Sequence, residues 1–385
     1  MKSKVLFIAN NIPTPTRNAN DVIIKIAQEL TKFHDISFLF PKEFAPFPIN
    51  KLPKYRHLSN LNKAWETSGF NIDPINYIRI PGLRHAFSLI GLSRHNISKY
   101  LEHNGLPTLV HAHYLLPDGY LAYMIKKEWG IPYIVSVRGS DIKYLSEMYA
   151  KGIKTDRYKQ VVEHASKIIT HNDYQKQYIE QQFDKECELI PHGVERSFLC
   201  NRELKKADNQ IIVAFVGSLI KLKRTSWVID AIKEYKGEKT VTLWIIGDGE
   251  ERQQLKNQAD GSKNIIFFCQ QPHENVSELL RQTVIFAMPS QRETFGLVYI
   301  EAAANKNAVI AVRNTGVWGV LEEDKEACFI SDYESFRSSL YNLIDNDEAR
   351  NKIAENGFEK TRDSLIWDKI AEKYERIYLQ TIDNK

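Results

Sequence analysis

Two carboxylates lie eight residues apart in the segment PSQRETFGLVYIEAAA, which follows the apolar run 284–288. The apolar run predicts a strand, and the later part of the segment predicts a helix. A helix that starts after a parallel strand offers unpaired N–H groups and a partial positive charge to a phosphate or a sugar oxygen. Gly296 has no side chain, so a ligand can approach the backbone there. Glu293 and Glu301 can therefore face one ligand, and carboxylates pair well with the vicinal hydroxyls of a hexose or ribose.

On spacing alone, a purely structural interpretation of the two carboxylates stays open. Glu293 would then stabilise the start of the helix through the helix dipole, and Glu301 would be a solvated helix residue.

In the first half of the chain, apolar strand-like runs alternate with amphipathic segments of helix length, such as 21–32 and 118–129. This alternation is typical of a parallel sheet that is covered on both faces. The stretch 44–93 is less regular and rich in Pro, aromatic and basic residues, which suggests an insertion that contacts substrate or covers the domain. The runs that predict strands are 5–9, 36–40, 109–113, 133–137, 168–171 and 188–190.

The same alternation restarts after a polar segment at 196–209, which we interpret as a linker. The chain beyond Tyr333 predicts helix to its end, and 367–379 is strongly amphipathic. The fold class is therefore α/β, with two doubly wound, Rossmann-like domains and a ligand in the cleft between them, at the carboxyl ends of the strands. The second set of predicted strands is 212–216, 241–246, 265–268, 284–288, 308–312 and 328–330.

The composition of the 385 residues is that of a soluble globular protein, with 43% hydrophobic and 26% charged residues. No apolar run is long enough to span a bilayer, and no signal-peptide pattern follows Met1. Four cysteines without CxxC spacing fit reduced thiols, so we expect a cytoplasmic protein. Residues 1–199 carry 26 Lys and Arg against 19 Asp and Glu, so the first half favours an anionic partner, although ordinary surface scatter also explains the excess.

The segment from Pro289 resembles the E-x7-E signature of glycosyltransferase family 4 (group 1), whose members are retaining glycosyltransferases with the GT-B fold. The resemblance covers nearly the whole chain, because five further segments occur in the order and at the intervals usual for the family. These segments are LVHAHYLLPDG, GIPYIVSVRGSD, IPHGVE, VGSLIKLK and IIGDG.

The resemblance implies a role for each matching residue. Glu301 would accept hydrogen bonds from the ribose of a donor nucleotide, Glu293 would hold hydroxyls of the transferred sugar, and Lys223 would neutralise the diphosphate leaving group. A lysine in this place is physically sensible, since its ammonium group stabilises the charge that builds as the glycosidic bond breaks. The other residues that the resemblance assigns to the donor are Gly217, Ser218, Arg224, Gly247, Thr294, Phe295, Gly296 and Leu297.

Three positions depart from the family pattern. Ser218 stands where the family usually has an arginine that contacts the diphosphate, so Lys221 or Arg224 would have to replace it. Arg138 stands where many relatives have a histidine near the reacting sugar; we count it as catalytic, although arginine cannot act as a base near neutral pH. The usual Gly-Gly loop after the first strand is absent, and Asn18 or Asn20 would cap the next helix instead.

On the acceptor side, the expected residues are His113, Asp141 and His192. Both His111 and His113 would lie on one face of a strand end towards the cleft, but no third residue follows at metal spacing, so no metal is expected. His113 is either an acceptor-site residue or a buried, hydrogen-bonded histidine, and His192 could instead touch the donor.

We therefore expect a retaining, metal-independent transfer from a nucleoside diphosphate sugar, with UDP favoured and no cofactor. The acceptor would be a hydroxyl of a glycan or a polyprenyl-linked sugar in cell-surface polysaccharide synthesis. An N-terminal domain (1–196, with the helix 366–385 packed back on it) would bind the acceptor, and 197–365 would bind the donor. The run 78–90 would suit contact with an anionic membrane or the packing of a core helix, and no nucleic-acid partner is expected. The alternatives are a nucleotide-sugar epimerase of GT-B fold and a catalytically silent sugar-nucleotide-binding protein.

Overall fold

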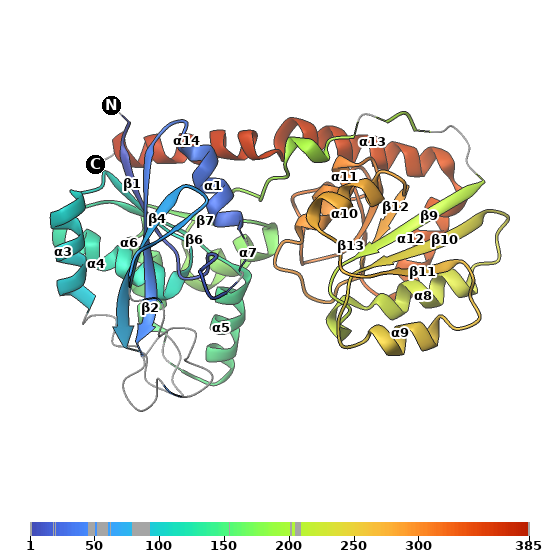
Figure 1. Ribbon diagram of the computed structural model, residues 1–385, viewed down its shortest axis with the longest axis horizontal. Coiled ribbons are helices and arrows are strands. Elements are labelled where there is room, and N and C mark those ends of the chain that lie inside the picture. The colour runs from blue at the N-terminus through green and yellow to red at the C-terminus, as the bar shows by residue number, and fades with distance from the viewer. Residues whose placement is uncertain are drawn as a thin grey trace. The chain divides into compact units, whose positions relative to one another are not determined.

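The computed structural model describes residues 2–17, 19, 21–44, 51, 61, 63–78, 93–153, 155–200, 202–204 and 209–383. The chain divides into two compact units (Figure 1). The first unit comprises Met1–His171, Gln175–Ile190 and Ala371–Lys385, and the second comprises Asn172–Tyr174 and Pro191–Ile370.

The first unit is built on an eight-stranded sheet with the order β3-β4-β2-β1-β5-β6-β7-β8. Neighbouring strands are parallel except β3 and β4, which pair antiparallel. The strands are β1 (Lys4–Ile8), β2 (Asp35–Phe44), β3 (Trp65–Thr67), β4 (Phe70–Ile78), β5 (Leu109–Ala112), β6 (Tyr133–Ser136), β7 (Lys167–Thr170) and β8 (Glu188–Leu189).

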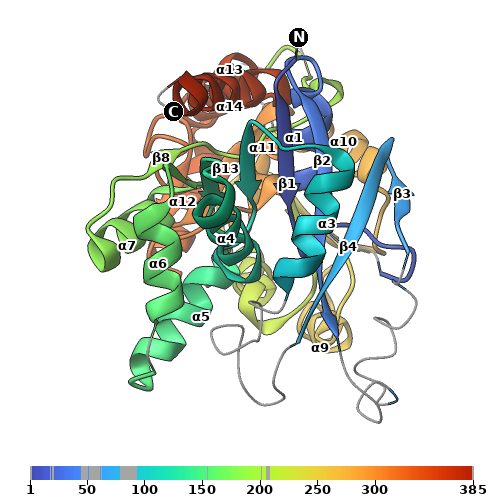
Figure 2. The ribbon, with the colours of Figure 1, turned by 90° about the vertical axis from the view of Figure 1, so that its left-hand side faces the viewer.

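Helices cover both faces of this sheet, as the continuous burial of β5 and β6 requires. On one face, Leu6, Val110 and Tyr133 belong to a buried cluster with residues of α3, α4 and α6; Figure 2 shows α3 and α4 in front of the strands. On the other face, Phe7 and His111 pack together, and His111 contacts Tyr378 of α14. The helices are α1 (Val22–Leu30), α3 (Arg94–Asn104), α4 (Tyr120–Trp129), α5 (Gly139–Ala150), α6 (Asp156–His164), α7 (Asp173–Phe183) and α14 (Trp367–Asp383), with a short π-helix at Leu115–Gly119.

The prediction for the stretch 44–93 was wrong in part, because β3 and β4 lie within it. Buried and exposed residues alternate along most of β4, as expected for a strand with one buried face. Pro74 and the polar residues around it hide this pattern in the sequence. A proline is tolerated here because β4 is next to the edge of the sheet, where it pairs with the three-residue β3.

The second unit contains a six-stranded parallel sheet with the order β11-β10-β9-β12-β13-β14. Its strands lie close to the predicted runs. Figure 1 shows α8 and α9 on one face of the sheet and α10, α11 and α13 on the other. The elements are β9 (Gln210–Val216), α8 (Thr225–Glu234), β10 (Thr240–Ile246), α9 (Arg252–Gln258), β11 (Ile265–Phe268), α10 (His273–Leu280), β12 (Ile285–Ala287), α11 (Leu297–Ala304), β13 (Ala308–Val312), β14 (Cys328–Ile330), α12 (Tyr333–Asp345) and α13 (Asp347–Ser364).

The predicted fold class, two α/β domains on mainly parallel sheets, is confirmed. Because all strands of the second sheet are parallel, the loops that follow β9, β10, β12 and β13 emerge at one edge. In a doubly wound sheet the carboxyl edge is where ligands bind.

Some expectations fall outside the described residues. These are the caps proposed at Asn18 and Asn20 and all of the run 78–90 after Ile78. No helix among the residues that the structure describes combines the length and the apolar character needed to cross a bilayer.

Candidate functional site

Lys223 and Glu293 form an ion pair at the carboxyl edge of the second sheet. Lys223 ends a short 3-10 helix (Lys221–Lys223) after β9, and Glu293 lies in the turn between β12 and α11. The two side chains are only 18% and 15% exposed, so water screens their charges less than it would at the surface. The sequence segments that were predicted to hold a leaving group and a sugar are therefore brought together, 70 residues apart in the chain.

The backbone of Glu293 is clamped by the loop that follows β13. Thr315 Oγ1 accepts a hydrogen bond from Glu293 N (2.7 Å) and donates one to Glu293 O (2.9 Å). Gly316 N also donates to Glu293 O (3.2 Å). Asn172, a residue of the second unit, donates from Nδ2 to Thr294 O (2.9 Å) and Gly316 O (2.8 Å). These bonds fix the turn that carries the carboxylate.

The start of α11 has the features of an anion site. Gly296 is its N-cap and adopts φ 75° and ψ 72°, a left-handed conformation that favours glycine. A Cβ atom there would lie 2.6 Å from the Tyr299 ring and 2.8 Å from Glu293 Cγ. Among the described residues, none accepts a hydrogen bond from the N–H groups of Phe295, Gly296 or Leu297. These three donors and the helix dipole point to a negatively charged ligand.

Glu301 lies one helical turn further along α11 and is 7% exposed. Its Oε1 is hydrogen-bonded to His273 Nε2 at 2.8 Å, and the His273 ring packs on Phe198 with the ring centres 4.7 Å apart. The solvated-residue interpretation of Glu301 is therefore wrong, because a carboxylate that is this buried needs a partner.

Two glycine loops form the remaining part of this edge. Leu219 N donates to Asp248 O (2.9 Å), which joins the loop after β9 to the loop after β10. A Cβ atom on Gly247 would lie 2.0 Å from Gly217 O, so only glycine fits where the loops cross. Ser218 is exposed beside them.

Arg224 follows Lys223 in a left-handed conformation (φ 49°), and its guanidinium group lies 4.3 Å from the centre of the Trp227 ring. This cation–π contact holds Arg224 on its own helix. Lys221 is exposed on the same short helix.

His192 was grouped with the acceptor side, but the structure places it in the second unit. It is 6% exposed, and its ring centre lies 4.8 Å from that of Phe295. It therefore lies beside the candidate donor residues, as the alternative expectation for this histidine requires.

In the first unit, Arg138, His113 and Asp141 meet where β5 and β6 end. Arg138 Nε donates to His113 O (3.3 Å), and Nη2 lies 3.2 Å from His113 Nδ1. Asp141 accepts hydrogen bonds from Arg138 N (2.9 Å) and Leu115 N (3.2 Å). Arg138 is only 6% exposed, and both other side chains are buried.

Burial raises the pKa of Asp141 to about 7, against the opposing effect of the two backbone hydrogen bonds and of the Arg138 charge. Burial also raises the pKa of Asp118, which accepts a hydrogen bond from Asn10 N (3.2 Å). Two buried carboxyl groups that take up protons more easily when folded make the first unit sensitive to pH.

We expect this sensitivity to appear as a loss of stability with rising pH. A carboxyl group whose folded pKa exceeds its unfolded pKa of 3.8 stabilises the fold fully below 3.8 and loses that contribution as the pH rises through about 7. The unfolding free energy from urea denaturation should therefore fall between pH 5 and pH 7.5. Asp141→Asn should flatten the fall by up to about 1.4 kcal/mol per pH unit. Asp156→Asn, at an exposed aspartate of the same unit, should leave the slope unchanged; an equal effect of both changes would contradict this prediction.

His111 and His113 are both completely buried, which fits the second interpretation of His113, a buried and hydrogen-bonded histidine, and not a side chain exposed to a cleft. His111 is hydrogen-bonded through Nδ1 to Tyr378 Oη (2.6 Å) and through Nε2 to Ser136 Oγ (2.9 Å). Within the described part of the chain, no three His, Cys, Asp or Glu side chains are grouped so that they could hold a metal ion.

Sequence reasoning missed four residues of the candidate site: Asn172, His273, Thr315 and Gly316. Thr315-Gly316 follows the predicted strand 308–312, so its position at a strand's carboxyl end was the one available signal. Nothing in the sequence indicates that Asn172 or His273 contacts the segment around Glu293.

Comparisons with known proteins indicate the family of the chain. A model described as "Glycosyl transferases group 1" matches residues 200–360, and one described as "Glycosyltransferase Family 4" matches residues 19–198. The chain is 25% identical over 327 residues to a putative teichuronic acid biosynthesis glycosyltransferase, TuaC of Bacillus subtilis, with 82% of each sequence covered. It is 26% identical over 289 residues to an uncharacterised glycosyltransferase of Methanocaldococcus jannaschii, with 74% of this chain and 78% of the relative covered.

Solved structures resemble the whole chain. A sucrose-phosphate synthase from Thermosynechococcus elongatus superposes with a TM-score of 0.74 at 16% identity, with both chains fully covered. The Anabaena protein HepE in complex with UDP and glucose superposes with a TM-score of 0.64 at 15% identity, covering 98% of this chain and all of the other. At these identities the likeness shows the fold.

Proposed function

The chain belongs to the group 1 glycosyltransferases, which have the GT-B fold, and we propose its reaction from this premise. It moves a sugar, with retention of configuration, from a nucleoside diphosphate sugar to an acceptor hydroxyl. The observation that carries the proposal is the Lys223–Glu293 ion pair beside the free N–H groups at the start of α11. One cation and three donors suit a diphosphate, and a neighbouring carboxylate suits sugar hydroxyls.

The donor is proposed to bind the second unit. Its diphosphate would take Lys223 and the N–H groups of Phe295, Gly296 and Leu297, while the sugar hydroxyls would bind Glu293. Glu301 would accept hydrogen bonds from the ribose, and the ribose would then compete with His273 for the Glu301 carboxylate. UDP is the favoured nucleotide, because HepE has been solved with UDP and glucose.

The proposed transfer step uses no metal ion. The bond between the anomeric carbon and the diphosphate oxygen breaks, the acceptor oxygen bonds to the same face of that carbon, and the acceptor proton passes to the leaving diphosphate. Lys223 and the start of α11 stabilise the charge that develops on the leaving group. On the acceptor side we propose Arg138, which acts through its charge and is held in place by the buried His113 and Asp141.

The acceptor is proposed to be a glycan or a lipid-linked sugar used in cell-surface polysaccharide synthesis. The similarity to TuaC, which carries the description of a putative teichuronic acid biosynthesis enzyme, supports this acceptor class. The positive excess in residues 1–199 also suits an anionic acceptor.

Incubation with single UDP-sugars, with and without a glycan acceptor, tests the proposal. We expect a product that forms only with acceptor, with an anomeric configuration by NMR equal to that of the donor. Release of an epimerised sugar nucleotide without acceptor would show the epimerase instead. Donor binding measured by thermal shift, without any turnover, would show the silent binding protein.

Thr315 should determine how well Glu293 is placed. Thr315→Val keeps the shape of the side chain but removes both hydrogen bonds to the Glu293 backbone, so we expect kcat to fall by about tenfold or more. Thr315→Ser keeps the hydroxyl and should restore most of the rate, which a loss of packing alone would not do. Equal rates for the two variants would contradict this role. The measurement is steady-state kinetics at saturating donor.

A further inference from the structure

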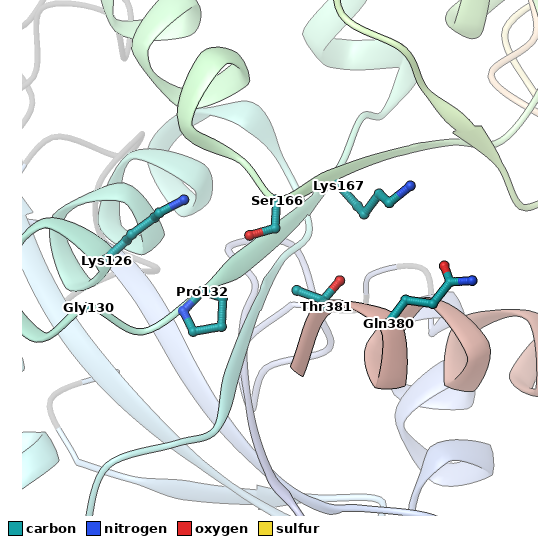
Figure 3. Close-up of a pocket in the computed structure, with 7 residues that line it drawn as sticks. All are labelled: Lys126, Gly130, Pro132, Ser166, Lys167, Gln380 and Thr381. Atoms are coloured by element: carbon teal, nitrogen blue, oxygen red, sulfur yellow. The ribbon is translucent and has the colours of Figure 1, made fainter. Parts of the chain in front are cut away.

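A cavity of about 370 Å³ opens at the amino ends of β6 and β7 in the first unit (Figure 3). Pro132 directly precedes β6 and Ser166 directly precedes β7, so the cavity lies at the edge of the sheet opposite to Arg138. The six residue-to-residue steps from Pro132 to Arg138 span about 20 Å of extended chain. A ligand in this cavity would therefore lie far from Arg138, the residue of the first unit proposed to act on the acceptor side. Its other lining residues are Lys126, Gly130, Lys167, Gln380 and Thr381.

Two lysines line the cavity, and the ammonium group of each is held by a hydrogen bond to a residue outside the lining. Lys126 Nζ donates to His164 O (2.8 Å), and Lys167 Nζ donates to Glu188 Oε1 (2.8 Å). Each ammonium has three N–H donors, so each keeps two for a ligand. Figure 3 shows the two lysines on different segments, Lys126 on α4 and Lys167 at the start of β7.

The residues that line the cavity carry an excess of positive charge. No described residue that lines the cavity is acidic. Burial and the nearby charge of Lys185 lower the pKa of Lys126. Glu188 offsets the charge of Lys167, with which it forms an ion pair.

Neutral donors complete the site. Ser166 contributes a hydroxyl and Gln380, in the last turns of α14, contributes an amide. Ammonium, hydroxyl and amide N–H groups together satisfy the several acceptor oxygens of a phosphate, and charge-assisted bonds of this kind are the stronger ones. The volume lies in the range of small-ligand pockets.

We propose that this lysine-lined cavity binds a phosphate group, carried either by a soluble sugar phosphate or by the headgroup of an anionic lipid. The site is independent of the donor site proposed in the second unit. It would hold a phosphorylated ligand on the first unit by contacts that play no part in the chemistry of transfer.

Two measurements distinguish the sources of the phosphate. Calorimetric titration of the full chain with glucose 6-phosphate, at constant ionic strength, tests the soluble ligand. Co-sedimentation with vesicles of phosphatidylcholine, with and without phosphatidylglycerol, tests the lipid. The variant Lys126→Gln/Lys167→Gln removes both ammonium groups, and Lys99→Gln/Lys127→Gln removes the same charge from exposed positions of the same unit outside the cavity.

We expect the cavity variant to bind at least tenfold more weakly in one of the two measurements, and the charge-matched control to bind as the wild type does. Ser166→Asp keeps both lysines but places a carboxylate in the cavity, and it should weaken the same binding if the double variant fails to fold. The proposal is overturned if the cavity variants bind as the wild type does in both measurements, or if the control loses as much affinity as they do.

Discussion

Glu293→Gln is expected to slow sugar transfer on the order of 10²-fold while leaving the affinity for UDP unchanged or slightly higher. The substitution removes the charge that pairs with Lys223 but keeps the size of the side chain. Lys223 is then free to meet the diphosphate, whereas the sugar hydroxyls lose the carboxylate proposed to orient them. Calorimetry with UDP and steady-state kinetics with the UDP-sugar measure the two effects separately.

Lys223→Gln should differ from Glu293→Gln in its effect on UDP binding. UDP binding weakens together with transfer, and kcat/KM falls on the order of 10²–10³-fold, because the variant lacks the cation that stabilises the leaving group. Matched controls are Glu348→Gln and Lys263→Gln, which change the same charges at exposed positions of the second unit. Near-normal transfer by either site variant, or an identical effect of both on UDP affinity, would contradict the roles proposed for the pair.

Gly247→Ala is expected to destabilise the second unit by about 3–5 kcal/mol or to prevent its folding. The added methyl carbon would lie 2.0 Å from the backbone oxygen of Gly217, so the backbone of one of the two loops would have to move. The φ angle of 147° also disfavours alanine. Urea denaturation of the purified variant measures the change in the unfolding free energy.

Gly261→Ala separates the steric clash from the backbone strain. Gly261 adopts φ 76°, but a Cβ atom there would meet nothing within 4 Å. We expect a cost of only about 1–2 kcal/mol, from the left-handed conformation alone. If the two alanine variants were equally stable, the close approach of the loops at Gly247 would not be the cause.

The regular elements of the second unit could be predicted because their patterns are local. The predicted strand 308–312 has the bounds of β13, and the predicted strand 328–330 has those of β14. Each is a short, continuous apolar run, as expected for a strand of a parallel sheet that is buried on both faces. The strand β4 was missed for the converse reason, since Pro74 and nearby polar residues hide its alternating pattern.

The candidate site was predictable only in part. The spacing of residues around a predicted helix start indicated Glu293 and Glu301, and the resemblance to the family indicated Lys223. Their partners were not predictable: Thr315 is 22 residues from Glu293, and His273 is 28 residues from Glu301. Thr315 lies in a loop and His273 is the first residue of α10, and no periodic pattern in the sequence records which other segment lies beside them.

The sequence by itself determined the fold class, the family and the residue types available for binding a phosphorylated sugar. The tertiary structure decided which of these residues meet. It paired Lys223 with Glu293, removed His111 and His113 to the core, and placed His192 beside Phe295. The physical reason is that strand and helix patterns depend on neighbours along the chain, whereas contacts between loops depend on the order of strands in the sheet.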